Sequence, residues 1–262
     1  MAQKKTGKRM FLLDEIRGFA IILMVLYHAF YLVGYQFDVP LGRTLFDFFT
    51  PAEPYFAAVF VLICGICCHL SHNNLRRGLW LAGAALLLSA CLYCAVWWGM
   101  LTADCVIWFG ILHCLATCIL LYALLRPALS FIPAWIGVPV CLALFLLCWH
   151  IPANEGGYFG WEGLFAVPVS PAPAETPWLY PLGLCPIGPC GDYFPLLPWG
   201  FCFLAGTFLG RPAAKGRFPK VFYRQHVPFL GTAGRYSLYI YLLHQPVLYL
   251  VCELIVWLGS RF

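Results

Sequence analysis

Three histidines lie inside apolar segments of this sequence, and charged residues precede each of them. His28 follows Arg17 by eleven residues in the stretch RMFLLDEIRGFAIILMVLYHAFYLVGY, residues 9–35. Eleven residues make about three helical turns and rise ~16 Å, so in a helix the two side chains lie within ~20° of each other. A guanidinium can bind phosphate, and an imidazole can remove a proton from an attacking amine or hydroxyl. One helix face therefore carries a cation and a candidate general base.

A structural interpretation of the same residues is also open. Arg17 can anchor the helix at the membrane interface and pair with Asp14, three residues earlier. It stands in the first helical turn, where the helix dipole disfavours a cation, and Asp14 and Glu15 would offset that locally. His28 can simply hydrogen-bond to a neighbouring helix. Against this, ionisable groups within a bilayer usually mark a pathway or a site.

The other two histidines have similar surroundings. His113, in FGILHCLA, follows Asp104 by nine residues, and His244, in SLYIYLLHQP, follows Arg235 by nine. Nine helical residues rise ~13 Å, which places both near the middle of a membrane, at the depth of His28. Three imidazoles at one depth indicate a shared polar cavity, although a structural role for His113 is equally open.

The composition indicates an integral membrane protein. The 262 residues are 62% hydrophobic and 10% charged, with a mean hydropathy of +0.81, whereas soluble domains carry about 25% charged residues. Apolar spans of about 20 residues cross the hydrocarbon core. We predict an all-α polytopic membrane protein, one domain over residues 1–262, with about seven transmembrane helices. The predicted spans are 16–35, 52–70, 79–98, 104–125, 131–150, 193–210 and 236–258.

The basic residues predict the orientation. With seven spans and a cytoplasmic N-terminus, all of the 16 Lys and Arg residues except Arg43 and Arg261 fall on the cytoplasmic side, as the positive-inside rule requires. Because the charges are sorted by loop, the net charge of +5 says little about nucleic acid, and we predict no nucleic-acid partner. Most of the 14 cysteines lie in apolar runs without zinc spacing, so we predict no metal.

A long external loop is predicted at residues 151–194. It contains eight prolines and seven glycines, and it has no Lys or Arg. A loop of this length without secondary structure is usually functional or disordered, and Trp161 and Trp178 suggest packing on the protein or at the interface. Cys185 and Cys190 are the only cysteines that we consider candidates for a disulfide, and a free pair is as plausible.

Several motifs resemble one family. RMFLLDEIRGFAIILMVLYH resembles the bacterial relatives of heparan-alpha-glucosaminide N-acetyltransferase, in the transmembrane acyltransferase superfamily, through an Asp-x-x-Arg-Gly opening, an apolar helix and a histidine. The stretches DFFTPAEPYFAAVFVLICGI, DYFPLLPWGFCFLAG and GRYSLYIYLLHQP look like the same family, and FGILHCLA extends the match over most of the chain.

The resemblance implies cytosolic acetyl-CoA as donor and a sugar amine or hydroxyl across the membrane as acceptor. It also implies that Arg17 helps to hold the acyl-CoA and that His28 serves the chemistry. The sequence departs from the animal lysosomal enzyme, because loop 36–50 lacks the histidine credited to that enzyme. The chain is also much shorter and lacks the luminal domain, so the heparan substrate is not carried over.

These residues fit a transmembrane acetyl transfer. The phosphates of acetyl-CoA would bind Arg17, with Asp14 beside it, together with Arg76 and Arg77 or the basic cluster at 211–224. His28 would act as the base, with His244 as second candidate and His113 as a supporting group. Asp47 and Asp192 would orient a cationic or hydroxylated sugar. Direct transfer and an acetyl-histidine intermediate are both open.

Three alternatives remain. The nearest is O-acylation of a cell-surface polysaccharide, and a small proton-coupled transporter also suits mid-membrane histidines, although the sequence shows no repeated halves. A non-catalytic scaffold fits least. We expect a multi-pass protein of the plasma or inner membrane in contact with membrane lipid, and a homodimer is left open.

Overall fold

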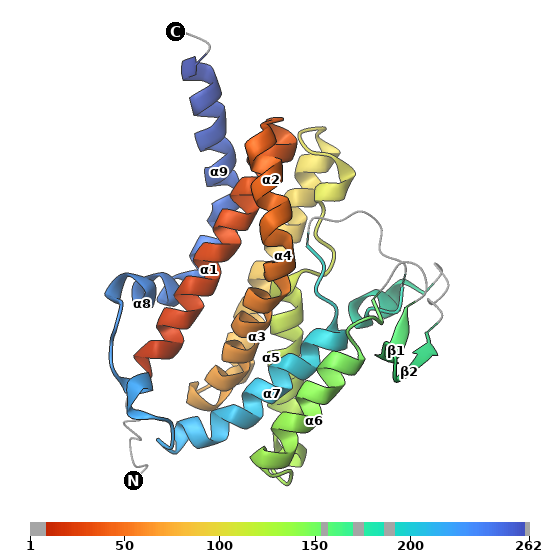
Figure 1. Ribbon diagram of the computed structural model, residues 1–262, viewed down its shortest axis with the longest axis vertical. Coiled ribbons are helices and arrows are strands. Elements are labelled where there is room, and N and C mark those ends of the chain that lie inside the picture. Colours follow the sequence, from red (N-terminus) through yellow and green to blue (C-terminus); the bar gives the residue numbers. More distant parts are fainter. Residues whose placement is uncertain (1–8, 153–156, 170–175, 186–191, 260–262) are drawn as a thin grey trace. The chain divides into compact units, whose positions relative to one another are not determined.

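The computed structural model describes residues 9–152, 157–169, 176–185 and 192–259. The chain is mostly helical, with 75% of residues in helices, and Figure 1 shows the helices in chain order. The α-helices are α1 (Phe11–Tyr31), α2 (Pro40–Phe49), α3 (Glu53–Leu70), α4 (Asn74–Trp97), α5 (Ile111–Leu129), α6 (Ala134–Leu147), α7 (Leu196–Ala214), α8 (Pro228–Arg235) and α9 (Ser237–Gly259). A π-helical turn, Leu32–Gln36, extends α1, and a 3₁₀ turn, Thr50–Ala52, joins α2 to α3.

Among these residues, five helical stretches are long and apolar enough to cross a membrane. They are Phe11–Gln36, Pro40–Leu70, Asn74–Trp97, Ile111–Leu129 and Ser237–Leu258, and they correspond to five of the seven predicted spans. The predicted span 131–150 contains the shorter apolar helix α6, and 193–210 overlaps α7, whose Leu197 has non-helical backbone angles. A total of seven spans and a cytoplasmic N-terminus stay predictions.

Two predicted boundaries are wrong. Residues 36–50 were expected to be a loop, but α2 occupies most of them because Pro40 stands at the first helical position, where proline is well tolerated. The span expected to begin at 104 begins at Ile111 instead. A 3₁₀ turn, Ala103–Cys105, and extended backbone up to Gly110 precede it.

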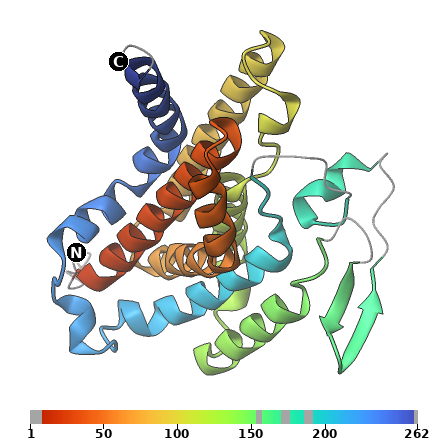
Figure 2. The same ribbon diagram turned by 45° about the horizontal axis from the view of Figure 1, so that its top comes forward.

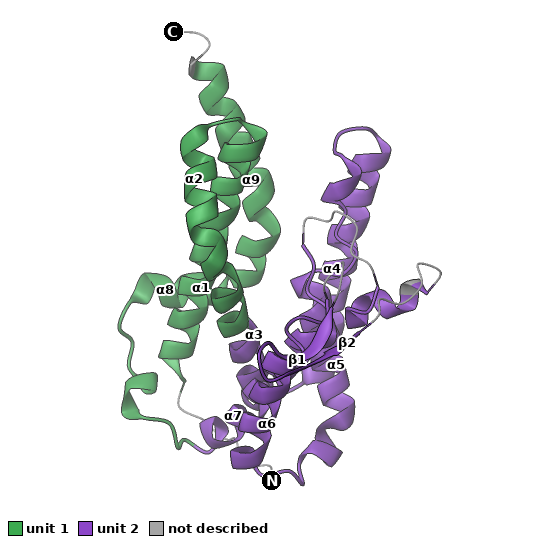
Figure 3. Cartoon of the chain, turned by 45° about the vertical axis from the view of Figure 1, so that its right-hand side comes forward, with its two compact units in different colours: residues 1–60, 216–262 green, residues 61–215 purple. Residues whose placement is uncertain are grey.

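The chain divides into two compact units, drawn in different colours in Figure 3. Unit 1 contains residues 1–60 and 216–262, and unit 2 contains residues 61–215. Helix α3 therefore begins in unit 1 and ends in unit 2. Each unit is described by itself below.

In unit 1, α1 and α8 pack backbone against backbone. A Cβ atom added to Gly18 would lie 1.9 Å from the carbonyl oxygen of Leu230, and one added to Gly234 would lie 1.9 Å from the carbonyl oxygen of Asp14. No side chain fits at such distances, so the two glycines allow the close approach. This contact fixes the part of α1 that carries Arg17.

Unit 2 uses the same device between α3 and α7. Gly206 and Gly210 of α7 form a G-x-x-x-G pair, a spacing that brings membrane helices close together. A Cβ atom at Gly206 would lie 2.1 Å from the carbonyl oxygen of Leu62, and one at Gly65 would lie 2.2 Å from that of Phe203. The fully buried side chains of this unit gather around α5 and α7 and include Leu115, Ile119, Phe203 and Phe208.

The segment 151–194, predicted to be a loop, contains regular structure. Strands β1 (Tyr158–Trp161) and β2 (Phe165–Pro168) pair in antiparallel fashion, with Trp161 opposite Phe165, and Figure 2 shows them beside α6. A 3₁₀ helix, Pro177–Leu182, follows. The chain is therefore mostly helical rather than all-α.

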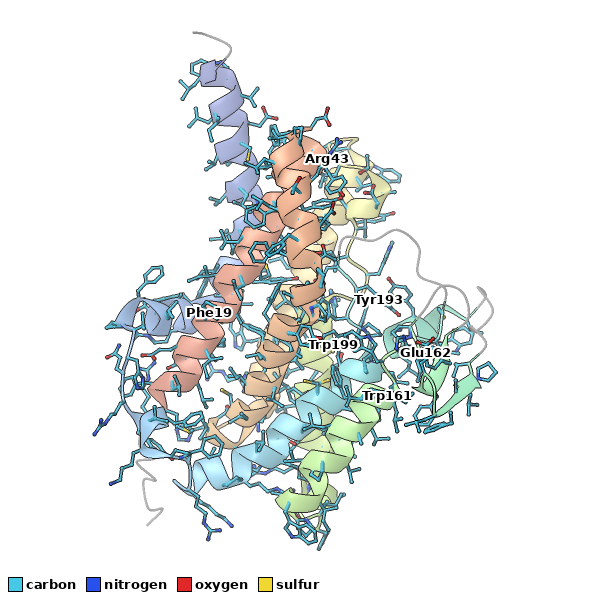
Figure 4. The ribbon with its side chains drawn as sticks, in the orientation of Figure 1. Phe19, Arg43, Trp161, Glu162, Tyr193 and Trp199 are labelled. Carbon is cyan, nitrogen blue, oxygen red and sulfur yellow. The ribbon has the colours of Figure 1, made fainter. Side chains whose placement is uncertain are left out.

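Two features of this segment bear on earlier predictions. Trp161 and Glu162, labelled in Figure 4, are exposed, so Trp161 is not buried against the described protein. The Cys185 thiol is free and donates to the carbonyl of Thr176 at 3.1 Å. Cys190, its predicted partner, lies outside the described residues.

Candidate active site

The structure brings His28 and His244 together in unit 1. His28 lies toward the end of α1, and His244 lies in the second turn of α9. Their ring centroids are 4.9 Å apart, and the rings are tilted by 56°. The two residues were predicted separately as base and second candidate, and they form one pair.

Backbone carbonyls fix the orientation of both rings. Nδ1 of His28 lies 3.0 Å from the carbonyl oxygen of Met24, and Nδ1 of His244 lies 2.6 Å from that of Tyr241. A carbonyl only accepts hydrogen bonds, so in the neutral imidazoles Nδ1 carries the proton and Nε2 carries the lone pair. Each histidine therefore offers Nε2 as a base.

One ring nitrogen of His244 lacks a hydrogen-bond partner in the described part of the chain. Its side chain is buried, and Nε2 has no hydrogen-bond partner within the described part of the chain. A buried polar atom without a partner costs free energy and requires an explanation. A substrate that donates a hydrogen bond to Nε2 would remove this cost.

Aromatic rings surround the pair. Tyr27 lies edge-on to His28 at 5.7 Å and stacks on Phe46 of α2 at 4.7 Å, while Tyr241 lies 5.7 Å from His244. The pair is therefore held between rings from α1, α2 and α9. Rigid neighbours of this kind keep a catalytic group in place.

Arg17 is bonded to protein groups of unit 1. Its Nε donates to the carbonyl of Gly234 at 2.7 Å, and its Nη2 donates to Asp14 at 2.8 Å. The expected pairing of Arg17 with Asp14 is therefore confirmed. Asp14 also accepts from Arg9 at 2.6 Å, so this carboxylate lies between two guanidinium groups. Arg17 thus ties α1 to α8 at the glycine contact.

Glu15 has a role that its neighbours in the sequence do not reveal. Its side chain is buried, and one carboxylate oxygen accepts from the backbone N–H groups of His226 at 2.7 Å and Val227 at 3.0 Å, directly before α8. Glu15 therefore satisfies donors at the start of α8, where an anion is favourable. Pro228 at the first position of α8 signals that start, but nothing in the sequence indicates which residue caps it.

Arg76 and Arg77 belong to unit 2. Arg76 is exposed, and the Asn73 side chain accepts its backbone N–H at 2.9 Å. Arg77 is partly buried and donates to the carbonyl oxygen of Cys64 at 3.3 Å and to its sulfur at 2.9 Å. No ion pair joins Arg77 to a carboxylate of the described residues. Nearby, Asn74 donates to the carbonyl of Cys68 at 2.8 Å, and its Oδ1 is buried without a partner in the same part of the chain.

Of the three residues predicted to bind the acceptor, Asp47 lies in unit 1, and Asp192 and His113 lie in unit 2. Asp47 is exposed on α2 in unit 1, and the hydroxyl of Tyr35 donates to it at 3.5 Å. Asp192 lies in unit 2 and accepts the backbone N–H of Ile111 at 3.2 Å, so it caps α5.

His113 lies in the first turn of α5 in unit 2, beside Ser89. The continuous helical rise assumed from Asp104 is absent, because residues 106–110 between the 3₁₀ turn and α5 are not helical, and the depth of His113 in a membrane stays a prediction. His28 and His244 are thus in contact, and His113 belongs to the other unit.

Comparisons with known proteins give one result. Residues 9–246 match the family model described as "Heparan-alpha-glucosaminide N-acetyltransferase, catalytic". The match covers most of the chain and includes every candidate site residue described above. Searches of curated proteins and of solved structures returned no match. In the structure, no group of three His, Cys, Asp or Glu side chains within the described ranges is placed to hold a metal ion.

Proposed function

This chain belongs to the heparan-alpha-glucosaminide N-acetyltransferase catalytic family, a family of membrane acetyltransferases, and from that premise we propose a specific reaction. The protein moves the acetyl group of cytosolic acetyl-CoA to an extracytoplasmic acceptor, which is an amino sugar or a glycan. It acts as a multi-pass protein of the plasma or inner membrane. The observation that supports this proposal most is the His28–His244 pair, with Nε2 as the lone-pair nitrogen of each ring.

The chemistry requires a base at the acceptor nitrogen or oxygen. Nε2 of His28 takes the proton from the acceptor as the nucleophile attacks the thioester carbonyl carbon. The carbon–sulfur bond breaks, the acetyl group stays on the acceptor, and CoA leaves as a thiolate that regains a proton. His244, at 4.9 Å between ring centroids, is close enough to share this work. If Nε2 attacks the thioester itself, an acetyl-histidine forms first and the acceptor then removes the acetyl group.

Arginines are the proposed binding groups for the phosphates of acetyl-CoA. Arg77 has no carboxylate partner among the described residues, so we assign a phosphate of acetyl-CoA to its charge, and Arg76 lies exposed beside it. Arg17 is retained as a candidate because a guanidinium has five donors, although Asp14 and Gly234 already accept from it. Asp14 then acts by orienting Arg17.

Carboxylates are the proposed binding groups for the acceptor sugar. Asp47 is exposed and can attract a cationic sugar amine, and Asp192 lies where the long loop returns to α5. His113 provides a hydrogen-bonding group two residues after Ile111, whose N–H donates to Asp192. A cationic acceptor favours N-acetylation, and hydroxyl acceptors would make the protein an O-acyltransferase of a cell-surface polysaccharide.

The decisive experiment is transfer from radiolabelled acetyl-CoA by the purified protein. A panel of amino sugars and neutral glycans serves as acceptors, and the labelled product identifies N- or O-acetylation. His28→Ala should lower the rate by roughly 10²–10⁴-fold, while acetyl-CoA binding survives. His72→Ala is the matched control, because His72 is exposed in the turn between α3 and α4.

Two results would contradict the proposal. A folded His28→Ala protein that transfers acetyl groups at near wild-type rate would move the catalytic role to His244. Uptake of a sugar into proteoliposomes without acetylation, driven by a proton gradient, would instead support the transporter alternative.

A further inference from the structure

A hydrogen-bonded chain of three groups runs through unit 2, where α4 and α5 pack side by side. The Ser89 side chain of α4 lies 2.5 Å from the carbonyl oxygen of Ile107 and 3.4 Å from Nε2 of His113. Ile107 belongs to the extended segment before α5, and His113 belongs to the first turn of that helix. The chain thus joins two helices and the segment between them.

The donor and the acceptor in each of these hydrogen bonds follow from the Ile107 carbonyl at one end of the chain. The Ile107 carbonyl can only accept, so the single hydroxyl proton of Ser89 points to it. Ser89 Oγ then has only lone pairs left for His113, and Nε2 of His113 must be the donor. The neutral imidazole consequently carries its lone pair on Nδ1, the opposite of His28 and His244.

Nδ1 of His113 is buried and has no hydrogen-bond partner in the described ranges. The residue as a whole is only partly buried. An orphaned acceptor of this kind needs a donor. The group that fits it is a hydroxyl or an amine, and a carbonyl or phosphate oxygen does not.

The segment around His113 is the place where the long loop meets a helix. Asp192 caps α5 two residues before His113, and the Phe194 N–H donates to the Phe109 carbonyl at 3.0 Å. These contacts hold the start of α5 against the end of loop 151–194. Because loop 151–194 is predicted to be external and the proposed acceptor is extracytoplasmic, we assign His113 to the acceptor side.

We propose that Ser89 is a positioning residue that keeps His113 protonated on Nε2, so that Nδ1 accepts a hydrogen bond from a hydroxyl or amine of the acceptor. This inference rests on the proposed function, because it assigns a donor group of the acceptor to that site. It adds Ser89, which the sequence did not single out, and it states which nitrogen of His113 is used.

Two measurements test the inference. The first is ¹⁵N NMR of the full-length, histidine-labelled protein in detergent, with the His113 signal assigned from its absence in His113→Gln. The wild-type protein should show Nε2 protonated and Nδ1 bare at neutral pH. The second is steady-state kinetics of Ser89→Ala, with Ser89→Thr as the conservative variant and Ser130→Ala as control. Ser130 lies after the far end of α5, where its hydroxyl donates to Pro127.

Ser89→Ala should mix the two tautomers of His113 and raise the KM for the acceptor by roughly 2- to 10-fold, the value of one neutral hydrogen bond. The KM for acetyl-CoA should not change, and Ser89→Thr should restore both the tautomer and the acceptor KM. A merely structural serine would change stability without changing the ratio of the two KM values.

The inference is overturned if wild-type His113 carries its proton on Nδ1, a result that does not depend on whether Ser89→Ala folds. It is also overturned if Ser89→Ala shifts the tautomer and leaves the acceptor KM unchanged. Failure of the proposed function is distinguishable, because wild-type protein would then acetylate no acceptor while the NMR signal still reports the tautomer.

Discussion

The two units hold their arginines in different ways. In unit 1, Arg17 is neutralised by Asp14 at 2.8 Å and donates to the Gly234 carbonyl at 2.7 Å. In unit 2, Arg77 has a carbonyl and a thiol of Cys64 as its closest partners and no carboxylate among the described residues. Both were predicted to bind acetyl-CoA because both are basic residues at a predicted cytoplasmic edge. Arg17 therefore ties α1 to α8, and the proposal assigns a phosphate of acetyl-CoA first to Arg77.

Each unit also contains one carboxylate that caps a helix from a distant part of the chain. Glu15 accepts two backbone N–H groups before α8 in unit 1, and Asp192 accepts one at the start of α5 in unit 2. Both anions stand at a helix N-terminus, where they are favoured. The two units thus share the capping device and differ in how their arginine is neutralised. That difference can be tested by substitution.

The largest expected effect is on the fold of unit 1. In Gly18→Val the new Cβ would lie 1.9 Å from the Leu230 carbonyl oxygen, a backbone atom, so α1 and α8 must separate. We expect a loss of about 3 kcal/mol or more in the free energy of unfolding, at or above the usual cost of overpacking. Thermal unfolding in detergent measures it.

The control for this substitution is Gly83→Val. Gly83 lies in α4, and a Cβ atom there meets nothing within 4 Å. Its unfolding temperature should therefore stay close to that of the wild type. Equal losses from both substitutions would contradict the close α1–α8 contact as the basis for the position of Arg17.

A second prediction separates the two arginines. Arg77→Gln should raise the KM for acetyl-CoA roughly 10- to 100-fold, since a hydrogen bond to a charged group contributes about 1.5–3 kcal/mol. Arg17→Gln should lower the unfolding temperature and raise that KM less than Arg77→Gln does, because Arg17 already donates to Asp14 and to the Gly234 carbonyl. Acetyl-pantetheine, which lacks the nucleotide phosphates, is the control donor, and its KM should be insensitive to Arg77→Gln. A larger KM change from Arg17→Gln would restore Arg17 as the main phosphate ligand.

The histidine pair shows what the sequence could predict. Long apolar runs fixed the position of His28 and His244 within helices, and five predicted spans are found as helices of sufficient length and apolar character. Contact between α1 and α9 does not follow from either run, so the sequence indicated two candidates at one depth but not a ring separation of 4.9 Å.

The errors arose where local pattern and tertiary contact disagree. The predicted span 104–125 began too early because residues 106–109 are apolar enough to continue a span, whereas in the structure Phe109 pairs with Tyr193 and accepts the Phe194 N–H. Glu15 was assigned to its own helix because its true partners, at 226 and 227, are more than 200 residues away. Neither contact leaves a periodic signal in the sequence.

The smallest expected effect concerns the two capping carboxylates. Asp192→Asn keeps an oxygen that can accept the Ile111 N–H and removes only the charge at the start of α5. That charge contributes about 0.3–1 kcal/mol at an ordinary helix N-terminus. Glu15→Gln should cost more, up to about 2 kcal/mol, because Glu15 is 3% exposed, accepts two N–H groups and lies 3.4 Å from Nδ1 of His226. Unfolding temperatures of the two variants, measured side by side, rank the caps. The reverse order would mean that the buried glutamate is held mainly as a neutral acceptor, and that its charge does not stabilise α8.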